Sequence, residues 1–195
     1  MNSLSLPERL SARERLLAAA QELFYDEGVN TVGIDRVIAR AGVAKASLYN
    51  TFGSKEELVR AYLTARHETR RARVEARLAG LGSARERILG VFDVLRELAV
   101  ENGFRGCAFV RASAELRPGS SLKAVCDQTR RWLRTLLTDL ARDAGARDPA
   151  ALAAQLVLLY DGATVGAQMD ADTSAAASAR SAAAQLVDLA TAKTA

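Results

Sequence analysis

The sequence has 195 residues, enough for one large domain or for a small domain that shares a core with a larger one. Hydrophobic residues make up 49% of it, and with 3 prolines, 13 glycines and abundant alanine, leucine and arginine the composition favours helices over sheets. A net charge of +4 is too small to indicate a nucleic-acid partner by itself. Two cysteines, Cys107 and Cys126, exclude a disulfide framework, and their spacing is not that of a zinc site.

The first ten residues, MNSLSLPERL, lack the basic start and apolar run of a secretion signal. We find no stretch with the length expected of a membrane-spanning helix. We therefore expect a cytoplasmic protein without a membrane partner. Up to Gly80 thirteen lysines and arginines stand against ten acidic residues, so most of the positive surplus lies in the N-terminal part.

The first expected helix runs from Ser11, which can cap its N-terminus, to Gly28, which ends it. Apolar residues recur within it at spacings of three and four: Leu16, Leu17, Ala20, Leu23 and Phe24. Such a helix would supply most of the core of a small N-terminal domain.

Two short helices joined by a glycine follow in the stretch GVNTVGIDRVIARAGVAKASLYNTFGSK, residues 28–55. Apolar residues mark the first of them: Ile34, Val37, Ile38 and Ala41. Gly42 can end it in a left-handed conformation, and the next helix, from Ala44, turns Leu48 and Phe52 inward. Its remaining face is polar and free of carboxylates, which suits a surface laid against phosphates. The pattern indicates a helix-turn-helix whose second helix reads DNA.

The motif Gly-Ile-Asp-x-Val-Ile-x-x-Ala-Gly-Val-Ala-Lys-x-Ser-Leu-Tyr-x-x-Phe-x-Ser-Lys-Glu-x-Leu, Gly33 to Leu58, resembles the DNA-binding domain of TetR-family transcriptional regulators. The resemblance implies an all-α protein with an N-terminal three-helix helix-turn-helix domain, residues 1–53, to which the first turn of the next helix, 54–60, contributes. Residues 54–195 would form a C-terminal helical domain for ligand binding and dimerisation.

The same resemblance implies which residues contact DNA. Tyr49 and Lys55 match the recurrent phosphate contacts, and Tyr49 is otherwise a candidate core aromatic. Gly33 stands where serine or threonine often caps the second helix, so only backbone amides could bind phosphate there. The remaining expected contacts occupy the variable, sequence-reading positions: Lys45, Ala46, Ser47, Asn50 and Thr51. In a twofold dimer two reading helices would lie about 34–40 Å apart on a near-palindromic operator.

A long basic helix is expected from Lys55, after a capping pattern formed by Ser54 and Glu57. Its arginines are interpreted as a solvated face paired with nearby glutamates, and His67 as a surface residue. The residues of that basic face are Arg66, Arg70, Arg71, Arg73 and Arg77. The alternative, an extended DNA contact, disagrees with the resemblance, which implies that this helix leaves the DNA and transmits ligand binding.

The joint between the two domains is expected at residues 79–83, followed by a helix to about Gly103 and a short helical segment, 106–116, closed by Pro118. Two long helices, 121–144 and from Pro149 onward, have broad apolar faces that predict a four-helix bundle with a second copy of the chain; the alternative is that both pack inside one subunit. The expected interface residues are Leu133, Leu136, Leu140, Leu152, Leu156, Leu159 and Ala163. A last helix should end near Leu189.

Large side chains in the C-terminal part predict a pocket for a small apolar or amphipathic effector, with no cofactor or metal. The expected lining is Phe92, Phe104, Phe109, Gln128, Trp132 and Tyr160, although most could be ordinary core residues. Cys107 and Cys126 are interpreted as buried structural residues, and the alternative is a thiol sensor. An enzyme is disfavoured by the single histidine and the absence of HExxH, GxSxG and phosphate-binding motifs. The sequence thus predicts a dimeric repressor released from double-stranded operator DNA by an effector; the alternative is a ligand-binding or adaptor protein that does not bind an operator.

Overall fold

The computed structural model describes residues 10–117, 119–170 and 173–192, in which it contains nine α-helices and no strand. The helices are α1 (Ala12–Glu27), α2 (Ile34–Ala41), α3 (Lys45–Phe52), α4 (Lys55–Ala79), α5 (Ala84–Ala99), α6 (Ala108–Glu115), α7 (Lys123–Asp143), α8 (Pro149–Asp170) and α9 (Ser174–Thr191). The all-α prediction is confirmed, and the helix ends differ from the expected ones by a few residues. Pro118 lies outside the described residues.

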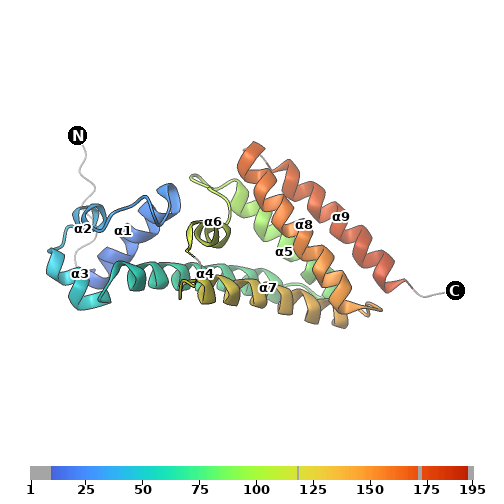
Figure 1. Cartoon of the computed structure of the whole chain (residues 1–195). Helices are drawn as coiled ribbons and strands as arrows, with labels where there is room; N and C mark the ends of the chain where they lie inside the picture. The colour runs from blue at the N-terminus through green and yellow to red at the C-terminus, as the bar shows by residue number, and fades with distance from the viewer. Residues whose placement is uncertain (1–9, 118, 171–172, 193–195) are drawn as a thin grey trace.

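The nine helices form two groups along α4 (Figure 1). Helices α1, α2 and α3 gather around the first part of α4, whereas α5, α8 and α9 pack together toward its other end. Helix α7 lies along α4, and α6 lies between the two groups. This arrangement makes α4 and α6 the structural links between the N-terminal helices and the rest of the protein.

Two glycines set the geometry of the N-terminal helices. Gly42 adopts the left-handed conformation, with φ 62° and ψ 42°, and so lets α2 end and α3 begin at once. Gly28 ends α1 with φ 98°, and a Cβ atom added there would lie 2.6 Å from a carboxylate oxygen of Glu115. A side chain at Gly28 would therefore strain the backbone and also push the Glu115 carboxylate aside.

The buried apolar side chains form two clusters. One contains the inward faces of α1, α2 and α3, and also Phe109 and Ala112 of α6 and Cys126 of α7. The other is built from α5, α7, α8 and α9. Helices α4 and α7 enter both, and α4 places Tyr62 in the first and Val74 in the second. Movement of α4 would therefore change the packing of both clusters, because close-packed interiors transmit strain.

Helix α8 has a buried face and an exposed apolar face. On one face Leu156 and Tyr160 are buried, whereas on the other Leu158 is 69% and Met169 is 78% exposed. By length and composition α8 could cross a bilayer, so the expectation that no stretch reaches that length is wrong. However, 44% of its most apolar part is buried inside the protein, and a single helix of this kind is weak evidence for a membrane span.

Candidate nucleic-acid interface and internal cavity

Helix α3 presents the face expected to read DNA. It begins at Lys45 after Ala44, whose extended backbone acts as the N-cap without a side-chain hydrogen bond. Leu48 is fully buried, and Phe52 is partly buried against the same core. Because Leu48 and Phe52 point inward, other positions of the helix point out: Ala46, Tyr49, Asn50 and Thr51 are exposed, and Ser47 is partly exposed.

Tyr49 lies on the outer surface and not in the core. Its side chain is 46% exposed, and its hydroxyl is available to accept or donate a hydrogen bond. Thr51 is constrained instead, because its hydroxyl donates a 2.6 Å hydrogen bond to the carbonyl oxygen of Ser47. Of these two polar side chains, Tyr49 is the freer to bind a phosphate.

Most basic side chains of the helix-turn-helix form ion pairs with acidic side chains of the same domain. Lys45 forms a 3.0 Å ion pair with Asp35, which raises the pKa of Lys45 through a hydrogen bond and charge attraction. Arg36 likewise binds Glu27, and Arg40 binds Glu22 at 2.8 Å. All six side chains are largely exposed, so these pairs are weak and can exchange a carboxylate for a phosphate.

Gly33 and Lys55 occupy the starts of two helices. Gly33 is the N-cap of α2, makes no side-chain cap and has open space where a Cβ would stand. Lys55 begins α4 after Ser54, whose hydroxyl accepts a 3.1 Å hydrogen bond from the backbone of Glu57. Partial burial lowers the pKa of Lys55, and the charge of Glu115 opposes that shift.

A cavity of about 570 Å³ lies between the two groups of helices. Its walls come from α1, α4, α5, α6, α8 and the loop before α6. The apolar part of the lining consists of Leu95, Leu98, Phe104, Phe109 and Tyr160. The volume falls within the range of small-molecule sites, and so does the mixture of an apolar wall with a few charged groups.

Only part of the expected pocket lining surrounds this cavity. Phe104, Phe109 and Tyr160 line it, and Phe92 lies fully buried behind Tyr160, with ring centres 6.0 Å apart. Gln128 is exposed on α7. Trp132 packs instead against the ring of His67, at 5.7 Å between centres.

Three arginines that were expected to face solvent line the cavity instead: Arg66, Arg70 and Arg73. Their spacing of four and three residues puts them on one face of α4, a signal that could have identified them as a group. The expectation of a wholly solvated basic face is therefore wrong, although Arg71 does pair with Glu75 at 2.6 Å.

His67 is buried, so its expected position at the surface is also wrong. Its Nδ1 atom lies 3.1 Å from the hydroxyl of Thr129 on α7, and its ring meets Trp132 edge to face. Burial lowers the pKa of His67, and the charges of Arg71 and Arg70 lower it further. A neutral imidazole thus helps to join α4 to α7.

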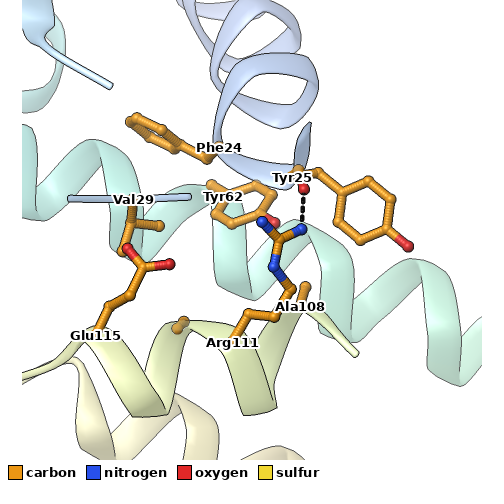
Figure 2. A pocket seen from close by; sticks show the side chains of 8 residues that line it. Phe24, Tyr25, Val29, Tyr62, Ala108, Arg111 and Glu115 are labelled. Atoms are coloured by element: carbon orange, nitrogen blue, oxygen red, sulfur yellow. Dashed lines mark hydrogen bonds between the residues drawn. The ribbon is translucent and has the colours of Figure 1, made fainter. Parts of the chain in front are cut away.

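Helix α6 is fastened to the end of α1 (Figure 2). Arg111 donates hydrogen bonds to the carbonyl oxygens of Tyr25 and Asp26, the last of these at 3.5 Å. Glu115 accepts a 2.8 Å hydrogen bond from the backbone N–H of Asn30, whose side chain donates to the Glu115 carbonyl at 2.6 Å. One short helix is therefore both a wall of the cavity and a contact of the N-terminal helices.

Most residues expected at a dimer interface lie in the core of a single chain. Leu133, Leu140, Leu152, Leu156 and Ala163 are buried, while Leu136 and Leu159 are partly buried against the same cluster. The apolar faces of α7 and α8 pack on each other and on α5 and α9. This arrangement leaves the opposite face of α8 exposed, with Leu158, Val165 and Met169 on it.

Comparisons with known proteins agree with the geometry. Residues 16–62 match the family model described as bacterial regulatory proteins, tetR family. The crystal structure of a TetR-family transcriptional regulator from Streptomyces coelicolor is similar, with 32% sequence identity, a TM-score of 0.88, and coverage of 93% of this chain and 96% of that one.

Two curated relatives are transcriptional regulators with opposite effects on transcription, one a repressor and one an activator. The HTH-type transcriptional repressor NemR of Escherichia coli is 32% identical over 147 residues, which are 73% of this chain. The match spans only 65% of the length of NemR. The HTH-type transcriptional activator FasR of Mycolicibacterium smegmatis is 47% identical over 62 residues, or 32% of this chain and 27% of that protein.

Proposed function

Because the chain belongs to the TetR family of bacterial regulatory proteins, we propose that it is a dimeric repressor that leaves its operator when a small molecule fills the internal cavity. The relatives described above are named as transcriptional regulators, two of them as HTH-type. Repression is favoured over activation because the NemR match extends well beyond the DNA-binding helices, whereas the FasR match is much shorter.

The DNA-binding part of the proposal rests on the outward face of α3. Lys45, Ala46, Ser47, Asn50 and Thr51 would meet base edges or nearby phosphates in the major groove. Tyr49 and Lys55 would bind the phosphate backbone, together with the backbone amides after Gly33. Residues 1–53 and the first turn of α4, 54–60, would act as the DNA-binding domain, and 54–195 as the regulatory domain. A regulator that binds an operator on the bacterial chromosome would be cytoplasmic.

The dimer part of the proposal rests on an exposed apolar stripe along α8. Small and apolar side chains follow one another there at helical spacing: Ala151, Ala154, Leu158, Gly162, Val165 and Met169. Leu189 of α9 is also 68% exposed. A row of this kind is typical of a helix that packs against a symmetry mate, which would give a twofold dimer and a near-palindromic operator.

One observation supports the regulatory part most strongly: α6 lines the cavity and also holds the end of α1. Phe109 faces the cavity, while Arg111 and Glu115 of the same helix hydrogen-bond residues at the end of α1 and just beyond it. A ligand that moves α6 would therefore move the N-terminal helices and change the separation of the two reading helices. The effector would act by favouring the dimer that cannot span successive major grooves.

The experiment is a gel shift of the purified protein with its own upstream intergenic DNA over a series of salt concentrations. We expect a complex with two protomers or a multiple of two, which weakens steeply with salt and resists competition by random DNA. Equal, weak binding to specific and random fragments from the whole genome would contradict operator binding. It would favour a ligand-binding or adaptor protein instead.

A further inference from the structure

We propose that the effector is an amphipathic organic anion, with an acidic head bound by Arg66 and Arg70 and an apolar body against the aromatic wall of the cavity. The inference rests on the proposed function, because it names the class of molecule that fills the regulatory cavity. It begins from arginines that lack carboxylate partners.

Arg70 has a charged side chain at the inner end of the cavity without an acid beside it. Its guanidinium donates to the sulfur of Cys107 at 3.9 Å and lies 5.0 Å from the centre of the Tyr160 ring. Among the described residues no carboxylate lies within ion-pair distance of Arg70. The Tyr160 side chain is also a hydrogen-bond partner of Arg70. A thiol and a neutral tyrosine are weak partners for five N–H donors, so part of the hydrogen-bonding capacity of Arg70 is left for an anion.

Arg66, one helical turn earlier, has a similar environment. Its guanidinium lies 3.7 Å from the centre of the Tyr25 ring, and its buried Nε atom has no hydrogen-bond partner. A buried donor without a partner is costly, and a cation without a nearby anion is more so. A ligand oxygen that reached Arg66 or Arg70 would remove part of that cost.

The acids around the cavity do not neutralise these two arginines. Glu101 is paired with Arg73 at 2.6 Å, and Glu22 is paired with Arg40 at 2.8 Å on the side of α2. Asp26 is exposed where α1 meets the cavity. Three carboxylates therefore lie on the lining, and two of them are already bound to other arginines. With Asp26 counted, the two arginines Arg66 and Arg70 still leave one positive charge in excess.

The apolar part of the lining indicates that the ligand also has an apolar body. Leu95 and Leu98 of α5 lie on one side, with Phe104, Phe109 and Tyr160 completing an apolar wall. A cavity of about 570 Å³ has room for an aromatic or aliphatic body in addition to an acidic group. A fully polar anion would leave that wall unused, and a neutral hydrocarbon would leave the guanidinium donors unpaired.

Two fluorescent probes that differ in one acidic group test the inference. The probes are 1-anilinonaphthalene-8-sulfonate and its uncharged counterpart N-phenyl-1-naphthylamine, each titrated into the purified full-length protein. We expect the sulfonate to bind at least about tenfold more tightly, since a charge-assisted hydrogen bond is lost with the neutral probe. Equal or tighter binding of the neutral probe would overturn the inference.

Substitutions then assign the preference to the cavity. Arg70→Gln and Arg66→Gln should each weaken the sulfonate about tenfold and change the neutral probe by less than about threefold. Arg71→Gln, on the exposed side of the same helix, is the matched control and should change neither. If one glutamine variant loses both probes, Arg70→Lys decides: retained preference for the sulfonate supports the inference, and loss of that preference overturns it.

The gel shift separates this inference from the proposed function. Arg70→Gln should bind the upstream DNA as the unmodified protein does, because Arg70 lies on the cavity and far along α4 from the reading helix. A protein that binds the operator but does not distinguish the two probes would overturn the anionic effector alone. A protein that distinguishes the probes but ignores the operator would contradict the proposed function alone.

Discussion

The hydroxyl of Tyr25 donates a 3.0 Å hydrogen bond to the carbonyl oxygen of Gly106, which joins the end of α1 to the loop that leads into α6. The same hydroxyl accepts a 2.9 Å hydrogen bond from the backbone N–H of Arg105. The Tyr25 ring lies under Arg66 on the wall of the cavity. The side chain of Tyr25, a residue of α1, thus contacts the loop before α6 and also lines the cavity in which a ligand is proposed to bind.

Tyr25→Phe should weaken the fold but not the contact with DNA. The substitution removes two hydrogen bonds at a partly buried site, so we expect the free energy of unfolding to fall by about 1–2 kcal/mol in urea titrations. Tyr49→Phe is the matched control, because it removes a hydroxyl from an exposed ring on α3. It should lower operator affinity severalfold and leave the unfolding curve unchanged. The reverse pattern would exclude the assigned roles of the two tyrosines.

Lys45→Ala should lower operator affinity by roughly tenfold and reduce the slope of log affinity against log salt if Lys45 binds a phosphate. If it reads a base edge, the loss should instead be confined to certain operator substitutions. Stability should not change measurably, because the ion pair with Asp35 is exposed on both sides. Lys123→Ala breaks a comparable exposed pair with Asp127 on α7 and should leave DNA binding intact. Unchanged affinity in Lys45→Ala would contradict the reading-helix assignment.

Stability should depend on pH through His67, the single histidine of the chain. Burial lowers the pKa of His67 in the folded protein below its unfolded value of 6.5, so the unfolded chain binds a proton more readily. The stabilising contribution is therefore complete above about pH 6.5 and is lost as pH falls through the window below it. Urea titrations between pH 7.5 and 5.5, each compared with His67→Gln, measure this effect. An equal pH slope in both proteins would show that His67 is not its source.

Leu158→Glu should convert a dimer into a monomer. The side chain is 69% exposed at the middle of the α8 stripe, where a charge would be buried without a partner if two copies met. Light scattering after gel filtration should give half the mass, and operator affinity should fall because only one reading helix remains attached. Val110→Glu replaces another exposed apolar residue, on α6, and should remain dimeric. A dimeric Leu158→Glu protein would locate the interface elsewhere.

Local sequence patterns predicted the helices well and predicted the helix-turn-helix almost completely. The alternation that turns Leu48 and Phe52 inward is a property of one helix, and it follows from helical periodicity alone. Gly42 acts at the expected position for the same local reason. Nothing beyond the nearest neighbours in sequence was needed for these features.

The cavity was harder to predict, because periodicity gives the face of a helix but not what that face meets. Trp132 and Gln128 share the helix that was expected to line the pocket, yet α7 packs Trp132 on His67 and leaves Gln128 in solvent. An arginine on a basic helix face is usually solvated. Arg70 is enclosed because Cys107, just before α6, and Tyr160 of α8 approach it. Contacts of this kind depend on tertiary packing that no local pattern encodes.

The most direct test of coupling between the cavity and the DNA surface is the affinity of 1-anilinonaphthalene-8-sulfonate for the protein, free and saturated with the upstream fragment that it binds. Linkage requires that the operator weaken the probe by the same factor by which the probe weakens the operator. We expect a reciprocal factor of about 5 to 150, the usual range of allosteric coupling. Identical probe affinity on and off the DNA would contradict a regulator whose operator binding is controlled through this cavity.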